Sequence, residues 1–216
     1  LTVGYLVNPN GDIQFPVLGT IHAEGYNKTQ LTKYITQQLI DKKLLVDPKN
    51  ENRVFSLWSQ VSKSEDGGKT WFPFLDWGHI HPDHHAFYIH PNNPEMMLDG
   101  NDGGLNISRD GGKTWNNVAG ALKDLPKGAW IAQVNAGEYG KGEAFVVAND
   151  YRRNNWKPYL YYTNDYGKTF TSLVPESGIS GYSMSVIQDP VEPNLLFFGT
   201  EMGLYFSLDK GKNWQQ

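Results

Sequence analysis

The sequence has 216 residues, a formal net charge of −4 and no cysteine. The lack of cysteine excludes disulfides, thiol nucleophiles and cysteine-ligated zinc, and the acidic balance without a Lys/Arg run argues against a nucleic-acid binder. No apolar run approaches the roughly 18 residues of a membrane span, so the chain is not expected to span a membrane, and it shows no signal peptide. The 23 Gly, 12 Pro and 13% aromatic residues favour short strands joined by tight turns.

The first 50 residues predict a small ββα segment. Residues 5–7 and 13–18 are strand-like, and the Asn-Pro-Asn-Gly run at residues 8–11 supplies a turn between them. Asn27 and Gln30 form a predicted capping pair at the start of a helix. The apolar stripe of that helix is Leu31, Tyr34, Ile35, Leu39 and Ile40. Asp47-Pro48 ends the segment.

Three stretches of this segment carry a resemblance to a known family. They are GYLVNPNGDIQFPVLGTIHAEG, the amphipathic helix, and LLVDP. Together, over most of residues 4–48, they resemble the periplasmic domain of outer-membrane polysaccharide export proteins. That family continues into a further strand after the Asp-Pro, which is not evident in this sequence. The resemblance implies a place in an export complex; a generic ββα piece is the alternative.

The remainder of the sequence is repetitive. Four octapeptides, SEDGGKTW, SRDGGKTW, TNDYGKTF and SLDKGKNW, have their central Asp residues 44, 55 and 44 positions apart. Residues 91–115 also align without gaps to residues 190–214, and each such unit contains four strand-like stretches. A strand-rich period of about 40–50 residues is typical of propeller blades. We therefore expect a mainly β fold: residues 1–50 form the α+β segment, and residues 51–216 form about four four-stranded blades of a β-propeller, either complete or part of a larger ring.

The octapeptide resembles the Asp box of BNR-repeat propellers, a family that includes sialidases, sortilin-like receptors and some xyloglucanases. Asp110 is expected to accept backbone N–H groups of its own turn, while Gly112 permits a positive φ. Ser108 and Thr114 bridge the turn, and Trp115 covers the hairpin. These are local, structural roles. The corresponding residues of the four boxes are Ser64, Asp66, Gly68, Trp71, Ser108, Asp110, Gly112, Trp115, Thr163, Asp165, Gly167, Phe170, Ser207, Asp209, Gly211 and Trp214.

The position of the octapeptide within each predicted blade indicates where a site would lie. The octapeptides join the third and fourth strands, so the loops between the second and third strands lie at the opposite rim. Asp102, Asp150 and Glu201 occupy those loops. The loop after Asp150 is longer and carries further candidate ligand-binding residues: Tyr151, Arg152, Arg153 and Trp156. An aromatic and basic insertion at a channel mouth predicts a ligand-binding loop, with an ordinary solvated loop as the alternative.

Five of the six histidines fall within DWGHIHPDHHAFYIHP, between residues 79 and 90. His79, His81, Asp83 and His84 are expected in the link between two blades, on the same rim as Asp102; His85 is expected to point inward. The spacing matches no established zinc signature. We therefore predict no metal and no cofactor, and assign His81 and His84 to a hydrogen-bonded, ligand-facing rim.

Three functional hypotheses follow. The first is a non-catalytic extracytoplasmic module that binds glycan or protein at this rim, at the periplasm, outer membrane or cell surface. The second is a glycoside hydrolase, which needs two facing carboxyl groups drawn from Asp83, Asp102, Asp150 and Glu201. The third is a component of a polysaccharide export system. With only four Arg, the chain lacks the arginine cluster of sialidases. Whether residues 1–50 and 51–216 are natively one chain stays open.

Overall fold

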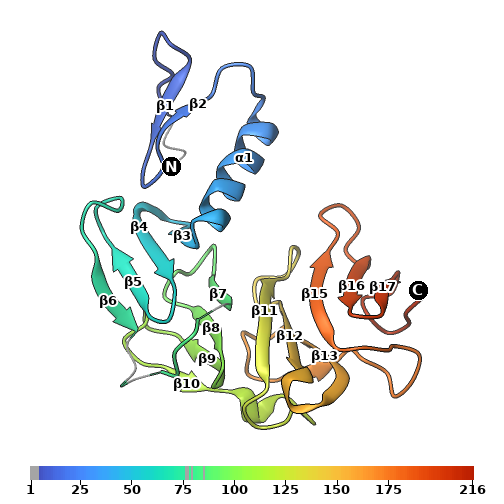
Figure 1. Ribbon diagram of the computed structural model, residues 1–216. Coiled ribbons are helices and arrows are strands. Elements are labelled where there is room, and N and C mark those ends of the chain that lie inside the picture. Colours follow the sequence, from blue (N-terminus) through green and yellow to red (C-terminus); the bar gives the residue numbers. More distant parts are fainter. Residues whose placement is uncertain (1–4, 76–77, 79, 85) are drawn as a thin grey trace. The chain divides into compact units, whose positions relative to one another are not determined.

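The computed structural model describes residues 5–75, 78, 80–84 and 86–216 (Figure 1). The chain divides into two compact units, Leu1–Leu75 and Asp76–Gln216, which we call unit 1 and unit 2. Strands dominate both units. Within the described residues, no helix is both long and apolar enough to cross a bilayer.

Unit 1 begins with a hairpin and a helix. Strands β1 (Asp12–Phe15) and β2 (Gly19–His22) pair antiparallel, and helix α1 (Lys28–Asp41) follows. Ile13, Ile21 and Ala23 form the buried core of this part. Because the two strands place these side chains on one face, the helix can cover them with its own apolar stripe.

The predicted strand at residues 5–7 is wrong, since these residues form no strand, and the predicted strand at residues 13–18 ends at Phe15, where the hairpin turn of residues 16–18 begins. Val17 and Gly19 adopt positive φ values of 69° and 75°, which lets the chain reverse there. The Asn-Pro-Asn-Gly run also forms a turn, but this turn precedes β1 and does not connect two strands. The Asn8 side-chain oxygen accepts the backbone N–H groups of Asn10 and Asp12 at 2.9 and 3.0 Å. Such a local turn needs no partner strand before it.

The predicted helix start is confirmed. The Asn27 side chain accepts the Gln30 N–H at 2.9 Å, and the Gln30 side chain accepts the Asn27 N–H at 3.0 Å. Two backbone donors of the first turn are thereby satisfied. The apolar stripe is only partly covered, since Ile35 packs against the hairpin core while Ile40 is 59% exposed.

The rest of unit 1 is a four-stranded antiparallel sheet in chain order. Its strands are β3 (Leu44–Asp47), β4 (Asn50–Leu57), β5 (Val61–Ser64) and β6 (Phe72–Leu75). The strand that was not evident in the sequence after the Asp-Pro is β4. It pairs with β3 on one side and β5 on the other. The LLVD stretch of the export-like segment is β3, so it forms the first strand of the sheet that contains the first octapeptide repeat.

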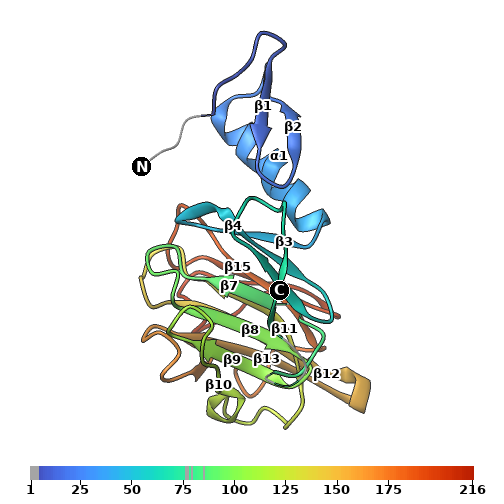
Figure 2. The same cartoon turned by 90° about the vertical axis from the view of Figure 1, so that its left-hand side faces the viewer.

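Unit 2 contains three antiparallel sheets over its described residues, again with neighbouring strands in chain order. The first consists of β7 (Ala86–Ile89), β8 (Met97–Asn101), β9 (Gly104–Ser108) and β10 (Asn116–Asn117), which Figure 2 shows side by side. The second consists of β11 (Trp130–Ala136), β12 (Ala144–Asp150), β13 (Asn155–Thr163) and β14 (Thr171–Ser172). The third consists of β15 (Ser183–Gln188), β16 (Leu196–Thr200) and β17 (Gly203–Ser207), with a bridge from Phe206 to Gln215 in the place of a fourth strand.

The sheets of unit 2 pack face to face in chain order. Successive side chains of β12 point to opposite faces. Val146 and Ala148 join the core shared with the first sheet, whereas Phe145 and Val147 join the core shared with the third. The middle sheet is therefore buried on both faces, which explains the unbroken apolar run FVVA.

The third sheet is covered on one face only. Leu105 and Leu204 occupy equivalent positions in the repeat, directly after the glycine that opens β9 or β17. Leu105 is fully buried against the middle sheet, whereas Leu204 is 61% exposed. Met184 and Ile187 on β15 are also more than half exposed. The expected mainly β fold with four-stranded sheets is confirmed; ring closure and blade number stay predictions.

Candidate functional site

Each Asp box is a turn closed by its own side chains. In the second box, the Ser108 hydroxyl donates to the Asp110 carboxylate at 2.8 Å and accepts the Gly112 N–H at 2.8 Å. Thr114 donates its hydroxyl to the other carboxylate oxygen at 2.6 Å and its N–H to the first at 2.9 Å. These bonds, above all those from Thr114, hold the pKa of the Asp110 carboxyl at about 2.

The other three boxes repeat this pattern. Asp66, Asp165 and Asp209 each accept the same bonds, and each carboxyl pKa is held at about 2. At the last box an Asn213 amide takes the place of the Thr hydroxyl, donating at 2.6 Å. Both oxygens of every box carboxylate are thus used inside their own turn, which leaves these groups poorly suited to bind a ligand.

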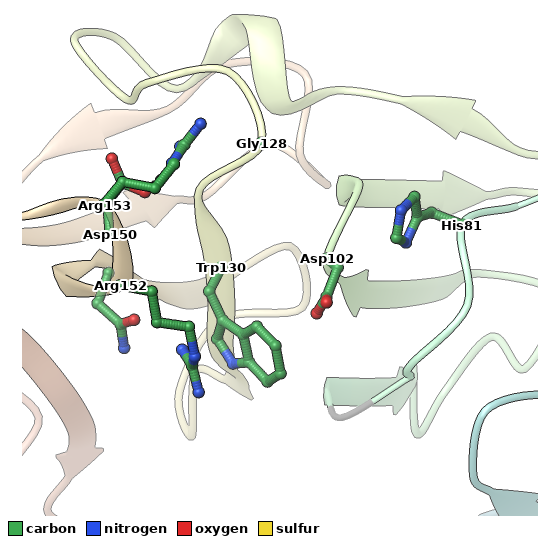
Figure 3. A pocket seen from close by; sticks show the side chains of 8 residues that line it. His81, Asp102, Gly128, Trp130, Asp150, Arg152 and Arg153 are labelled. Atoms are coloured by element: carbon green, nitrogen blue, oxygen red, sulfur yellow. The ribbon is translucent and has the colours of Figure 1, made fainter.

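A cavity of about 360 Å³ lies at the other end of the first two sheets of unit 2 (Figure 3). Asp102 reaches it from the loop between β8 and β9, and the 3₁₀ turn η2 (Tyr151–Arg153) reaches it from the loop between β12 and β13. Box residue Asp110 follows β9, whereas Asp102 precedes it, so the cavity lies at the sheet end away from the boxes. The residues lining it are His81, Asp102, Gly128, Trp130, Asn149, Asp150, Arg152 and Arg153.

Asp150 is held by its own loop. Its side chain is 8% exposed, and one carboxylate oxygen accepts the Arg153 Nε–H at 2.6 Å. The Asn155 amide approaches the other oxygen at 3.4 Å. Arg153 also donates to the Lys127 carbonyl at 2.9 Å, which ties η2 to the segment before β11. Asp150 is therefore a charge-paired group, and its oxygens are occupied.

Arg152 is held in a different way. Its guanidinium carbon lies 4.1 Å from the centre of the Trp130 ring and 4.7 Å from the centre of the Tyr151 ring. Figure 3 shows this guanidinium beside the Trp130 indole, with Asp102 on the opposite side of Trp130. Stacking on aromatic rings uses the faces of a guanidinium and leaves the N–H groups at its edge available.

Asn149 lines the cavity and has a side-chain acceptor that is itself buried and, within the described part of the chain, unsatisfied. The residue is 5% exposed, and its amide nitrogen donates to the Ser183 carbonyl at 3.0 Å. Its side-chain oxygen is buried and has no hydrogen-bond partner among the described residues. A buried oxygen without a donor is costly, and this one has almost no surface that a ligand could contact in this arrangement.

Beside the cavity, three aromatic side chains form a cluster that we call the aromatic platform: Tyr151, Trp156 and Tyr182. Tyr151 and Tyr182 stack at a centroid distance of 4.3 Å, and Trp156 contacts both rings. Trp156 remains 51% exposed, and its indole N–H donates to Asn154 at 3.0 Å. The platform adjoins the cavity through Tyr151, which also contacts Arg152.

The structure brings together some of the predicted site residues and separates others. Asp102, Asp150, Arg152, Arg153 and His81 line one cavity. Tyr151 and Trp156 belong to the adjoining platform.

Besides Tyr151 and Trp156, three predicted residues lie outside the cavity lining. His84 is buried, with its Nδ1 atom 2.8 Å from the Asp99 carboxylate. Glu201 is exposed in the loop between β16 and β17, and Asp83 lies in the link before β7. His79 and His85 lie outside the described residues. Over the part of the chain that is described, no three His, Asp or Glu side chains are placed to hold a metal ion.

Sequence reasoning missed Trp130, Asn149 and Tyr182. Asn149 pairs with Trp130 across β11 and β12, directly beside Asp150. The position within the repeat that indicated Asp150 could also have indicated Asn149, because Asn149 is the preceding residue. Tyr182 lies just before β15, so its place depends on packing between sheets, which the sequence pattern does not give.

Two segments of the chain match two different family models. Residues 1–54 match a model described as polysaccharide biosynthesis/export protein. Residues 107–117 match a model described as BNR/Asp-box repeat. The export-domain and Asp-box resemblances are thereby confirmed, whereas the similarity to sortilin-like receptors stays a prediction. No curated protein matches the sequence.

Solved structures of GH74 enzymes share the fold. An ancestral GH74 enzyme has 20% identity and a TM-score of 0.64, covering 81% of this chain and 23% of that one. A GH74 enzyme from Niastella koreensis has 19% identity and a TM-score of 0.65, covering 81% and 29%. The GH74 xyloglucanase from Xanthomonas campestris has 17% identity and a TM-score of 0.59, covering 80% and 29%. This chain therefore spans less than a third of the length of these structures, and the likeness concerns fold alone.

Proposed function

We propose that the chain is a non-catalytic, extracytoplasmic β-propeller module that binds glycan in the cavity lined by Asp102, Trp130 and Arg152. In this proposal residues 44–216 form about four blades, the first of which begins with β3. The face-to-face sheets of unit 2 and the likeness in fold to GH74 enzymes support the propeller. The match of residues 1–54 to polysaccharide export proteins supports an extracytoplasmic location and an export or surface complex.

One observation carries the binding function. The cavity combines the Asp102 carboxylate with a stacked Arg152, next to an aromatic platform whose Trp156 side chain is 51% exposed. Sugars present hydroxyl donors on their rims and apolar C–H faces. A cavity with hydrogen-bonding groups in its wall and an aromatic ring at its edge fits both features.

Hydrolysis is the second candidate, because Asp102 and Asp150 line the same cavity. A glycosidase needs one carboxyl group that gives up a proton and a second that acts as base or nucleophile. Asp150 is paired with Arg153 at 2.6 Å and also contacts Asn155, which favours binding over acid–base chemistry.

A glycan array probed with the purified chain tests the proposal. We expect selective binding that falls about tenfold or more in Asp102→Ala, since its carboxylate would accept sugar hydroxyls. The matched control is Glu201→Ala, which removes a loop carboxylate outside the cavity and should leave binding unchanged. Reducing-end release from a bound glycan, abolished in Asp102→Asn, would favour the hydrolase instead. An array without any selective signal would overturn glycan binding.

A further inference from the structure

The arginine content of the chain points to the charge of the ligand. Of four arginines, three donate to a carboxylate or a backbone carbonyl: Arg53, Arg109 and Arg153. Arg152 has no such acceptor anywhere in the described part of the chain. It is exposed, yet the Trp130 and Tyr151 rings fix its orientation. An arginine that is oriented in advance and lacks an anion is suited to receive one.

The neighbouring charges do not supply that anion. Asp150 is neutralised by Arg153, with which it shares the 2.6 Å contact. Asp102 lies on the opposite side of Trp130 from Arg152 (Figure 3). The Arg152 side of the cavity is thus positive, while the Asp102 carboxylate is an acceptor for hydroxyl groups.

We infer that the glycan bound here is acidic, a chain containing uronic acid residues, with one carboxylate on the edge of Arg152 and an adjacent sugar ring on Trp156. This inference rests on the proposed glycan-binding function and specifies its ligand class. A uronic acid carries the three required features: a planar carboxylate for the guanidinium fork, hydroxyl donors for the Asp102 carboxylate, and C–H faces for an aromatic ring. The cavity volume of about 360 Å³ is within the range of small-ligand sites, about 300–1,000 Å³.

The test uses the full chain and matched pairs of probes. Oligosaccharides containing galacturonate, glucuronate or mannuronate are titrated against the full chain, each beside its carboxyl-reduced, neutral counterpart. We expect at least one acidic probe to bind about 10- to 100-fold more tightly than its neutral partner. Binding of both members with equal affinity would overturn the inference while leaving the proposed function intact. If no glycan binds, neutral or acidic, the proposed function fails and this inference with it.

Single substitutions identify the side chain that causes the preference for acidic probes. Arg152→Met keeps the side-chain stem but removes the charge, so the preference for the acidic probe should disappear. Arg152→Lys keeps the charge but loses the planar fork, so an intermediate preference is expected. Lys157→Met removes an exposed positive charge just beyond η2 and should leave the preference unchanged. Trp156→Ala should weaken the binding of acidic and neutral probes to the same extent. A preference that persists in Arg152→Met, or is lost in Lys157→Met, would show that general electrostatics governs binding and would contradict the assignment to Arg152.

Discussion

Replacing Arg153 by Met tests whether the Asp150–Arg153 pair shapes the cavity. The substitution leaves the Asp150 carboxylate, only 8% exposed, without its 2.6 Å donor. Charge-assisted hydrogen bonds contribute about 1.5–3 kcal/mol, and stranding a buried charge costs about 3–5 kcal/mol. Because the Arg153 side chain is itself 51% exposed, water can partly replace it, so we expect unit 2 to lose about 2–3 kcal/mol. That corresponds to a fall in Tm of roughly 6–10 °C for a unit of this size.

Thermal unfolding followed by tryptophan fluorescence measures this loss. Arg152→Met is the matched control, since its stacking at an exposed position contributes about 0.5–1 kcal/mol. Adding Asp150→Asn to Arg153→Met removes the stranded charge and should restore most of the lost stability, as a double-mutant cycle would show. An Arg153→Met protein with the wild-type Tm would refute the reasoning, because the pair would then contribute nothing to holding the loop.

Two further predictions concern the sheets and their turns. Hydrogen bonds in the folded state hold the pKa values of the box carboxyl groups at about 2, below the roughly 3.9 of an unfolded chain. The ionised carboxylates therefore stabilise the fold fully above about pH 4–5, and this stabilisation is lost as the pH falls towards 2. Urea midpoints at pH 5, 3.5 and 2.5 should therefore fall less in Asp110→Asn than in the wild type; parallel declines would contradict this. Leu105→Ala should lower the free energy of unfolding by about 2–5 kcal/mol, whereas Leu204→Ala, at the equivalent position of the repeat, should lower it by less than about 1 kcal/mol, because only Leu105 is fully buried. Equal losses of the two variants in denaturant unfolding would contradict the packing described.

The sequence predicted the repeat well because the Asp box is local. Its hydrogen bonds join residues two to four positions apart, so the pattern of Ser108, Asp110 and Thr114 is visible without any knowledge of packing. The same phase placed Asp102 and Asp150 at one end of their sheets. Trp130 could not be found in this way, because its role depends on Arg152 reaching over from a neighbouring loop.

The N-terminal segment shows the opposite case. Residues 5–7 are apolar enough for a strand, and the Asn-Pro-Asn-Gly run is a strong turn signal. The hairpin nevertheless forms one turn later, where Val17 adopts a φ of 69° that a β-branched residue rarely takes. A position of this kind is set by the pairing of Ile13 with Ile21, which buries both side chains, and local propensity gives no hint of it.

The open face of the third sheet affects how the protein behaves in solution. Met184, Ile187 and Leu204 present apolar side chains to water, with Met184 at a bulge of β15. Exposed apolar side chains on an uncovered sheet face favour self-association. We therefore expect light scattering to rise with protein concentration and to fall in Ile187→Lys. Affinity measurements at the cavity are therefore best made at low protein concentration, where self-association is weakest.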